Sequence, residues 1–171
     1  TRIIRYEELY RLSHLLASAF EDLRLRKGDR VLLWGHNSPE WVLVFIACLI
    51  KGLIPVPVDI RSSLPFAKKI ADLAGVSYVF CDRGLNQSWN LERLIHFEDV
   101  RKIAEHCRRE TRPERADPEE TAAIFFTSGT TSEPKGVTLT HGNMVAVVES
   151  LRTFTAAFQE HEKWLSLLPL S

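Results

Sequence analysis

The first part of the chain alternates between helix-like and strand-like patterns of apolar residues. Across residues 6–25, apolar side chains recur at steps of three and four, which is the spacing of one buried helix face. These positions are Leu9, Leu12, Leu16, Ala19 and Leu23. Residues 31–34 form a short continuous apolar run, which predicts a buried strand. Ser38 and Pro39 are suited to begin a second helix and Gly52 to end it, so the predicted order is helix, strand, helix.

The same alternation continues to residue 81. Residues 53–59 look extended, and their two prolines, which cannot donate to a ladder, predict an edge or bulged strand. Residues 64–74 predict a helix that Gly75 closes, and residues 76–81 predict the next strand. The inner face of that helix is expected to carry Phe66, Ile70 and Leu73. Helices that alternate with continuous apolar strands predict parallel-sheet layers flanked by helices, which is an α/β fold.

A charged and Pro-rich stretch at residues 108–120 divides the chain. It follows a loop at residues 83–90 and a helix predicted over residues 97–107. Because the stretch has no apolar anchor, it predicts a solvated connector between two subdomains. The expected organisation is an α/β subdomain over residues 1–107, the connector, and an incomplete second subdomain over residues 121–171.

The second subdomain is predicted to begin with a strand, a polar loop and another strand. Apolar runs at residues 122–126 and 137–139 predict the two strands. A helix is expected over residues 142–158, and residues 164–170 return to a strand. The buried side of the helix is expected to hold Met144, Val147, Val148, Leu151 and Phe154.

Composition places the chain among ordinary globular proteins and narrows its partners. Lysine plus arginine number 22, as do aspartate plus glutamate, so no net basic field favours nucleic acid. The apolar run of residues 41–50 covers only about half of a bilayer core, so we expect a cytoplasmic protein without a transmembrane segment. Cys48, Cys81 and Cys107 are scattered, which predicts reduced thiols. Zinc binding by Cys107 with His106 is disfavoured, because adjacent helix residues point in different directions.

The loop between the last two predicted strands gathers residue types that bind phosphate. Residues 127–135 read Thr-Ser-Gly-Thr-Thr-Ser-Glu-Pro-Lys, and their hydroxyls, backbone N–H groups and lysine are donors suited to phosphate oxygens. The same residue types make ordinary surface turns, so composition alone leaves both interpretations open. Pro134 and Gly136 stand where the Walker pattern has Gly and then Ser or Thr, which disfavours a P-loop kinase or GTPase.

The order of residues in this loop resembles a family signature. Thr127-Ser-Gly-Thr-Thr-x-x-Pro-Lys-Gly-Val137, followed by Leu139-Thr-His-Gly-Asn143, looks like the signature loop of the adenylate-forming ligases. That superfamily includes acyl-CoA synthetases and peptide-synthetase adenylation domains. Ser132 stands where the family usually has Gly. Shorter matches such as Asn37-Ser-Pro-Glu-Trp41 precede the loop in the family order, and residues 167–171 resemble the next family motif.

The resemblance implies an acid–thiol ligase of the AMP-forming acyl-CoA synthetase type, with ATP, Mg²⁺ and coenzyme A as cofactors. A carboxylate would attack the α-phosphate of ATP, and the acyl-AMP would pass its acyl group to coenzyme A. The family's remaining working parts lie downstream, so the chain resembles an N-terminal fragment, without catalytic residues or the coenzyme A site, that is inactive alone. The residues implied in holding the ATP phosphates are Thr127, which would also contact Mg²⁺, and Ser128, Gly129, Thr130, Thr131, Ser132 and Lys135.

The resemblance leaves the substrate and the acceptor open. A long-chain fatty acid is the expected substrate, and the remainder of the ligase chain is an expected partner. A fatty acyl-AMP ligase or a peptide-synthetase adenylation domain is an alternative within the superfamily. An alternative of another class is a truncated, non-catalytic nucleotide-binding or interaction module. An isolated fragment would leave apolar surface and strand edges uncovered, so we expect non-native dimerisation.

Polar residues outside the loop are interpreted as structural. His36 is expected in a turn, and His141 is expected beside a helix start. Asp59 and Asp82 follow predicted strands and are interpreted as turn or cap residues. Ser128 is not a candidate esterase nucleophile, because the G-x-S-x-G pattern is absent.

Overall fold

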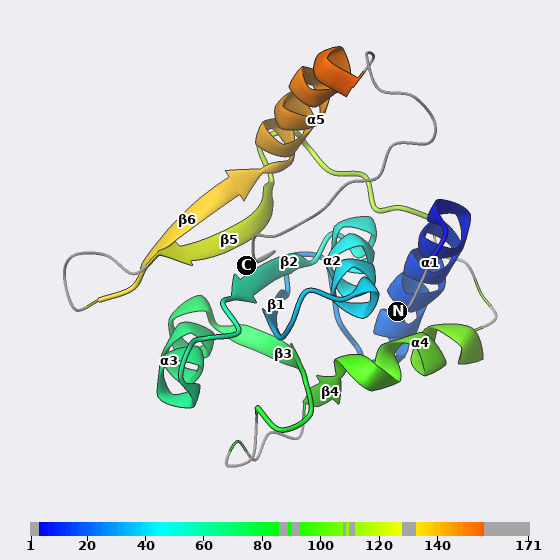
Figure 1. The fold of residues 1–171 in the computed structure, drawn as a ribbon. Helices are drawn as coiled ribbons and strands as arrows, with labels where there is room; N and C mark the ends of the chain where they lie inside the picture. Colours follow the sequence, from blue (N-terminus) through cyan, green and yellow to red (C-terminus); the bar gives the residue numbers. More distant parts are fainter. Residues whose placement is uncertain are drawn as a thin grey trace.

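The computed structural model describes residues 4–85, 89, 93–107, 109, 112–127 and 133–155, and within them helices alternate with strands (Figure 1). This order confirms the predicted α/β class. The elements are α1 (Tyr6–Asp22), β1 (Arg30–Trp34), α2 (Pro39–Lys51), β2 (Ile54–Val58), α3 (Leu64–Ala74), β3 (Val76–Cys81), β4 (Leu94–His96), α4 (Phe97–His106), β5 (Thr121–Thr127), β6 (Lys135–Thr140) and α5 (His141–Thr155).

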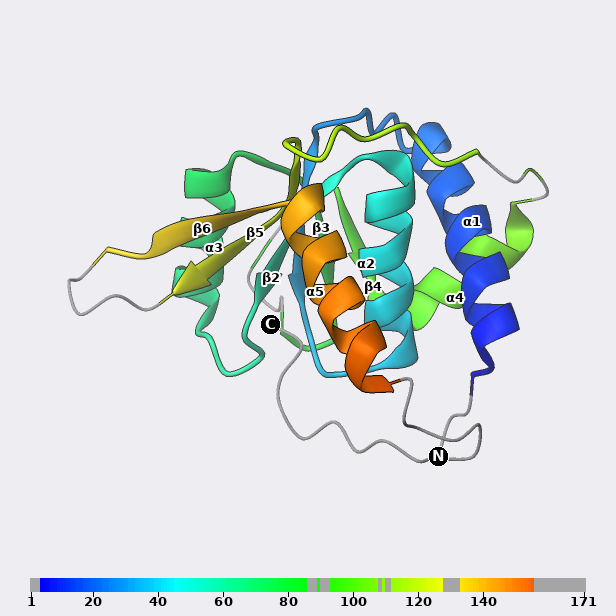
Figure 2. The ribbon, with the colours of Figure 1, turned by 90° about the horizontal axis from the view of Figure 1, so that it is seen from above.

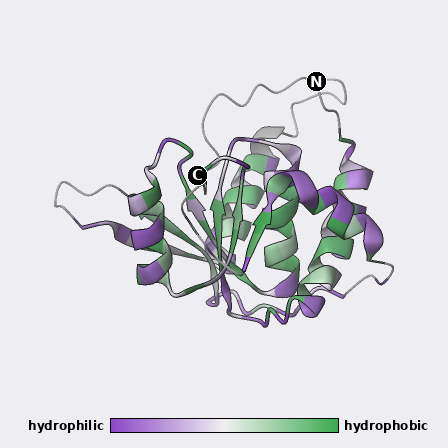
Figure 3. Ribbon diagram, turned by 90° about the horizontal axis from the view of Figure 1, so that it is seen from below, coloured by the Kyte–Doolittle hydropathy of each residue, from purple (hydrophilic) through white to green (hydrophobic). Residues whose placement is uncertain are grey.

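Four of the described strands form a parallel sheet in the order β2-β1-β3-β4. Figure 2 shows α1, α2 and α4 on one side of this sheet and α3 on the other. Hydrophobic residues concentrate in the strands and in the helix faces that cover them (Figure 3). One apolar cluster joins α1, α2 and α4 to the sheet, and a second joins α3 to the opposite sheet face. The parallel pairing predicted from the continuous apolar runs is therefore correct.

The ends of α2 follow from local sequence. The Ser38 hydroxyl accepts a hydrogen bond from the Trp41 amide at 3.0 Å, and Pro39 occupies the first turn. Gly52 ends the helix with φ of 68°, a left-handed conformation that glycine adopts without a Cβ clash. The first helix is shorter than predicted, because Arg24 adopts φ of 60° soon after Asp22.

The two prolines of β2 place this strand at one end of the described sheet, as predicted. The Ile54 amide donates to the Asp29 carbonyl at 2.9 Å, on the β1 side. Amides alternate in direction along a strand, so the nitrogens of Pro55 and Pro57 face away from β1. On that side β5 lies alongside β2, but the two strands belong to different sheets.

The second sheet is an antiparallel pair of β5 and β6, and α5 follows it directly. The predicted buried side of α5 is wrong for three residues: Val147, Val148 and Leu151 are 59%, 62% and 55% exposed. They are exposed because α5 is covered only near its start, where it meets β5 and β6, and residues 145–152 are all exposed. Met144 is half-buried, and the side chain of Phe154 lies outside the described part.

Two smaller expectations about the first sheet also differ from the structure. Leu73 is more than half exposed, because α3 meets the sheet through the side chains of Ala67, Ile70, Ala71 and Ala74. The three-residue strand β4 was not predicted, since it is too short to show a pattern. The strand expected over residues 164–170 lies outside the described residues.

The connector is exposed but fastened to the first subdomain. The Glu114 amide donates to the Ile50 carbonyl at 2.8 Å, and the Lys51 ammonium contacts the carboxylates of both Glu21 and Glu114. The Lys27 ammonium lies 2.8 Å from the Arg115 carbonyl and also contacts Glu120. The stretch predicted as a solvated connector is thus held to the first subdomain by ion pairs and a backbone hydrogen bond.

No helix among the described residues has the length and apolar character needed to cross a membrane.

Candidate phosphate-binding site

The polar loop begins and ends on paired strands. Thr127 is the last residue of β5, Lys135 is the first residue of β6, and the two are direct cross-strand partners. Side chains of directly opposed residues lie on the same face of an antiparallel pair. The hydroxyl of Thr127 and the ammonium of Lys135 therefore project from one face, at the end of the hairpin where the loop joins the two strands. The predicted phosphate-binding residues between them, Ser128, Gly129, Thr130, Thr131 and Ser132, lie outside the described residues.

A cavity of about 490 Å³ lies beside the loop entrance. Thr127 and the two phenylalanines before it, Phe125 and Phe126, form one wall. The other wall comes from the end of β2, the loop after it and two residues of α3, Phe66 and Ile70. The site is thus built where two segments far apart in sequence meet, and its lining mixes apolar side chains with the polar residues Asp59, Arg61, Ser62 and Thr127.

An ion pair within the β2–α3 loop supplies the charge at this cavity. The Arg61 side chain donates through Nε to Asp59 Oδ1 at 3.0 Å, and the Arg61 backbone amide donates to the same oxygen at 2.8 Å. These hydrogen bonds from Arg61 lower the pKa of the Asp59 carboxyl. The interpretation of Asp59 as a turn residue is correct, but sequence alone gave no sign that Asp59 and Arg61 line a cavity with Thr127.

The loop exit is also attached to α3. The Lys69 ammonium lies 2.9 Å from Glu133 Oε1, across 64 positions of sequence. Glu133 stands two residues before Lys135. Sequence reasoning missed this contact, because neither residue belongs to a pattern that marks the other as its partner.

A second polar pair, His36 with Asp82, lies at the carboxyl ends of β1 and β3. Asp82 Oδ2 accepts a hydrogen bond from the His36 amide at 2.8 Å and lies 2.6 Å from the ring nitrogen Nδ1. His36 lies in the loop between β1 and α2, and its contact with Asp82 was not predicted from the sequence. His141 begins α5 as expected, with its amide bonded to the Glu120 carbonyl at 3.0 Å.

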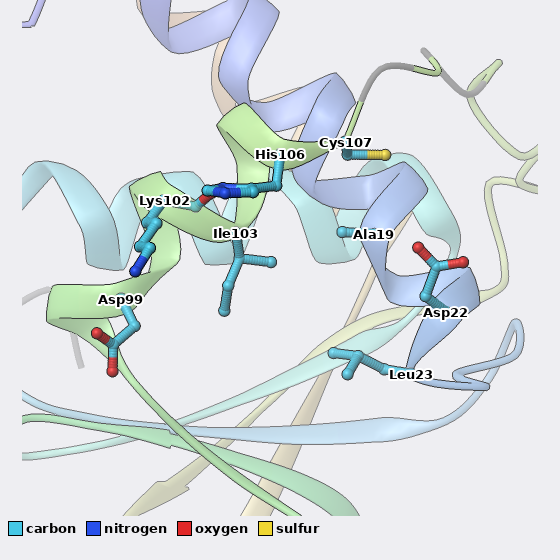
Figure 4. Close-up of a pocket in the computed structure, with 8 residues that line it drawn as sticks. All are labelled: Ala19, Asp22, Leu23, Asp99, Lys102, Ile103, His106 and Cys107. Carbon is cyan, nitrogen blue, oxygen red and sulfur yellow. The ribbon is translucent and has the colours of Figure 1, made fainter.

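A separate cavity of about 520 Å³ lies between α1 and α4 (Figure 4). His106 and Cys107 line it, but the His106 ring nitrogen Nδ1 is 2.7 Å from the Lys102 carbonyl, and the Cys107 thiol meets the Arg109 carbonyl. Within the described ranges, no group of three or more His, Cys, Asp or Glu side chains is arranged to hold a metal ion. Burial raises the pKa of the Cys81 thiol to about 12 and raises the pKa of Cys48 further.

The signature loop and the α/β fold together indicate an adenylate-forming enzyme, and the comparison with known protein families agrees with this class. The chain belongs to the AMP-binding enzyme family, whose pattern it matches over residues 1–171. Its relatives include acyl-CoA synthetases and carrier-protein ligases of the adenylate-forming type.

Two curated relatives illustrate this range. Long chain acyl-CoA synthetase 3 of Arabidopsis thaliana is 28% identical over 200 residues, which cover 97% of this chain and 30% of the relative. The L-proline--[L-prolyl-carrier protein] ligase of Pseudomonas fluorescens is 32% identical over 158 residues, which cover 86% of this chain and 32% of the relative. The chain therefore spans less than a third of either protein.

Solved structures agree with the fold. The o-succinylbenzoate CoA synthetase of Bacillus subtilis in complex with the acyl-adenylate intermediate OSB-AMP matches with a TM-score of 0.83 and 26% identity, over 99% of this chain and 44% of that one. The N-terminal subdomain of Klebsiella oxytoca NpsA matches with a TM-score of 0.71 and 26% identity, over 82% of this chain and 36% of that one.

Proposed function

We propose that this chain is the N-terminal part of a longer ATP-dependent ligase that activates a carboxylic acid as acyl-AMP and transfers it to coenzyme A. Membership of the AMP-binding family supports the adenylation step. The acyl-CoA synthetases among the relatives support coenzyme A as acceptor, and the long-chain enzymes support a fatty acid as substrate. We further propose that residues 1–107 and 121–171 are two subdomains joined by the connector, and that the protein is cytoplasmic.

The observation that carries this proposal is the pairing of Thr127 with Lys135 beside the cavity. Thr127 would offer its hydroxyl and the loop its backbone N–H groups to the β- and γ-phosphates, while the Lys135 ammonium would offset the charge of departing pyrophosphate. Adenylation brings a carboxylate against a polyphosphate, so charge compensation and positioning dominate its barrier. Neither residue is assigned as nucleophile or general base.

Mg²⁺ fits this site only in part. A threonine hydroxyl is an oxygen ligand of the kind Mg²⁺ accepts, and Mg²⁺ keeps several waters and substrate phosphates as ligands. Among the described residues no carboxylate cluster completes a protein cage. Thr127 would therefore be a single protein ligand from this chain, and the metal would supply charge compensation for the phosphates.

A carrier-protein thiol is a second candidate acceptor. The prolyl-carrier-protein ligase at 32% identity and the fatty acid--[acyl-carrier-protein] ligase of Streptomyces coeruleorubidus at 28% favour it. Both acceptors share the adenylation step, so the first half-reaction does not distinguish them.

The full-length protein that contains this chain tests the proposal by ATP–pyrophosphate exchange with a panel of fatty, aryl and amino acids. We expect exchange with long-chain fatty acids and, with the preferred acid, thioester formation on coenzyme A rather than on a carrier protein. Thr127→Ala and Lys135→Met should each lower exchange by about 100- to 1,000-fold, the range for losing one group that stabilises developing charge. Lys102→Met, which removes an exposed lysine on α4, is the matched control and should leave the rate unchanged.

Full exchange activity in Thr127→Ala and Lys135→Met would refute the assignment of the site. The isolated 171-residue chain should show no exchange, and turnover by it would refute the claim that the catalytic parts lie elsewhere.

A further inference from the structure

Both ends of the phosphate loop meet α3 or the loop that leads into it. At the entrance, Thr127 shares its cavity with Phe66 and Ile70 of α3. At the exit, Glu133 pairs with Lys69 of the same helix at 2.9 Å. The helix therefore lies beside both described ends of the loop, at Thr127 and at Glu133.

The helix is a fixed support for these contacts. Its N-terminus is capped by the Ser63 hydroxyl, which accepts a hydrogen bond from the Phe66 amide. Its inner face is buried against the sheet through Ala67, Ile70 and Ala74. Groups placed on a packed helix hold their position better than groups on a loop.

The link from Glu133 to Lys135 is short and stiff. Pro134 separates the two residues, and its ring restricts the backbone φ angle to about −65°. Lys135 then enters the β6 ladder opposite Thr127. A restraint on Glu133 is therefore carried by one proline to the backbone of Lys135, the residue whose ammonium group is assigned to the phosphates.

We propose that Lys69 is a positioning residue, whose ion pair with Glu133 holds the exit of the phosphate loop so that Lys135 is placed to bind polyphosphate; this inference rests on the proposed function. Without the pair, nucleotide binding has to order the loop exit itself, and that entropy cost weakens binding. The pair is partly exposed, at 41% for Lys69 and 70% for Glu133, so the effect is modest. We expect a two- to fivefold change, which is roughly what an exposed ion pair contributes.

Direct attraction between Lys69 and phosphate predicts a different result for Glu133. Glu133→Gln removes a negative charge beside the site and leaves Lys69 without this carboxylate partner, so simple electrostatics predicts tighter binding of the nucleotide. Positioning predicts weaker binding, because the restraint is lost. The direction of change in this one variant separates the two explanations.

The experiment uses the full-length protein and two measurements. The first is the KM for MgATP and the kcat in pyrophosphate exchange. Lys69→Met and Glu133→Gln should each raise the KM about two- to fivefold with kcat unchanged. Lys69→Arg and the charge swap Lys69→Glu with Glu133→Lys should return the KM to within about twofold of the wild type. Lys102→Met, away from the loop, is again the control.

The second measurement is hydrogen exchange at the amides of Lys135 and Gly136 without nucleotide. Exchange should be faster in Lys69→Met and Glu133→Gln and restored in the charge swap. An unchanged or lower KM in Glu133→Gln, no rescue by the swap, or unchanged amide exchange would each overturn the proposal. Because amide exchange needs no nucleotide, it tests the restraint even if the protein proves to have no ATP-dependent activity, so the two failures are distinguishable.

Discussion

Gly35, the residue that follows β1, is predicted to tolerate no side chain. A Cβ built on it would lie 2.7 Å from the nearest atom of the Phe97 ring and 2.9 Å from Asp82 Oδ1. Carbon atoms normally separate by about 3.5–4.0 Å, so the ring would have to retreat by roughly an ångström. Phe97 is 2% exposed and belongs to the cluster that joins α1, α2 and α4, where close packing leaves little room. Overpacking of this kind costs about 1–3 kcal/mol.

The assay for Gly35→Ala is urea unfolding followed by circular dichroism. With a slope of about 2 kcal/mol/M, the expected loss moves the midpoint down by roughly 0.5–1.5 M. Gly136→Ala is the matched control, because its nearest neighbours would be 3.3–3.4 Å away and are side-chain atoms of the hairpin. Phe97→Leu combined with Gly35→Ala should cost less than the sum of the single variants, since the smaller side chain makes room. A midpoint equal to that of the wild type, or strictly additive losses, would refute the reasoning.

Three further predictions concern charge, thiol chemistry and association. The folded-state pKa of Asp59 is lowered, so this carboxylate stabilises the fold above its unfolded pKa, and that stabilisation is lost as the pH falls through the folded pKa. Asp59→Asn should therefore reduce the dependence of the free energy of unfolding on pH in the acid range. An unchanged dependence would contradict the pairing with Arg61. Alkylation at pH 8 followed by mass spectrometry should label the partly exposed Cys107 and spare Cys81, whose buried thiol has a pKa of about 12; equal labelling of the folded chain would be inconsistent with the fold. The isolated chain should self-associate in light scattering, and Val148→Glu with Leu151→Glu should shift it toward monomer; a wild-type monomer at high concentration would contradict this.

The features that the sequence predicted best are those that depend on residues close together in the chain. The Ser38 cap, the Pro39 start and the Gly52 end of α2 depend only on residues a few positions apart, and each is found as expected. The parallel sheet followed from strands without polar alternation. The two strands expected on either side of the signature loop are found as β5 and β6.

Contacts between distant segments could not be predicted. Lys69 and Glu133 are 64 positions apart, and many other oppositely charged pairs were equally available in the sequence. His36 and Asp82, 46 positions apart, meet only because β1 and β3 are neighbours in the sheet. The buried side predicted for α5 is wrong for three residues, because an apolar pattern shows that a surface suits burial but does not show which segment covers it.

The prolines of β2 bear on how an isolated chain would associate. Along the side of β2 that faces away from β1, Pro55 and Pro57 present carbonyl acceptors and no amide donors. An incoming strand needs both in alternation, so this edge would form only half of the usual ladder. Association by strand exchange at β2 is therefore disfavoured, also because β5 lies alongside it, and the exposed apolar residues of α5 offer a different surface for joining two copies. A dimer of the isolated chain should then dissociate when that helix surface is made polar, while its β-sheet content stays the same.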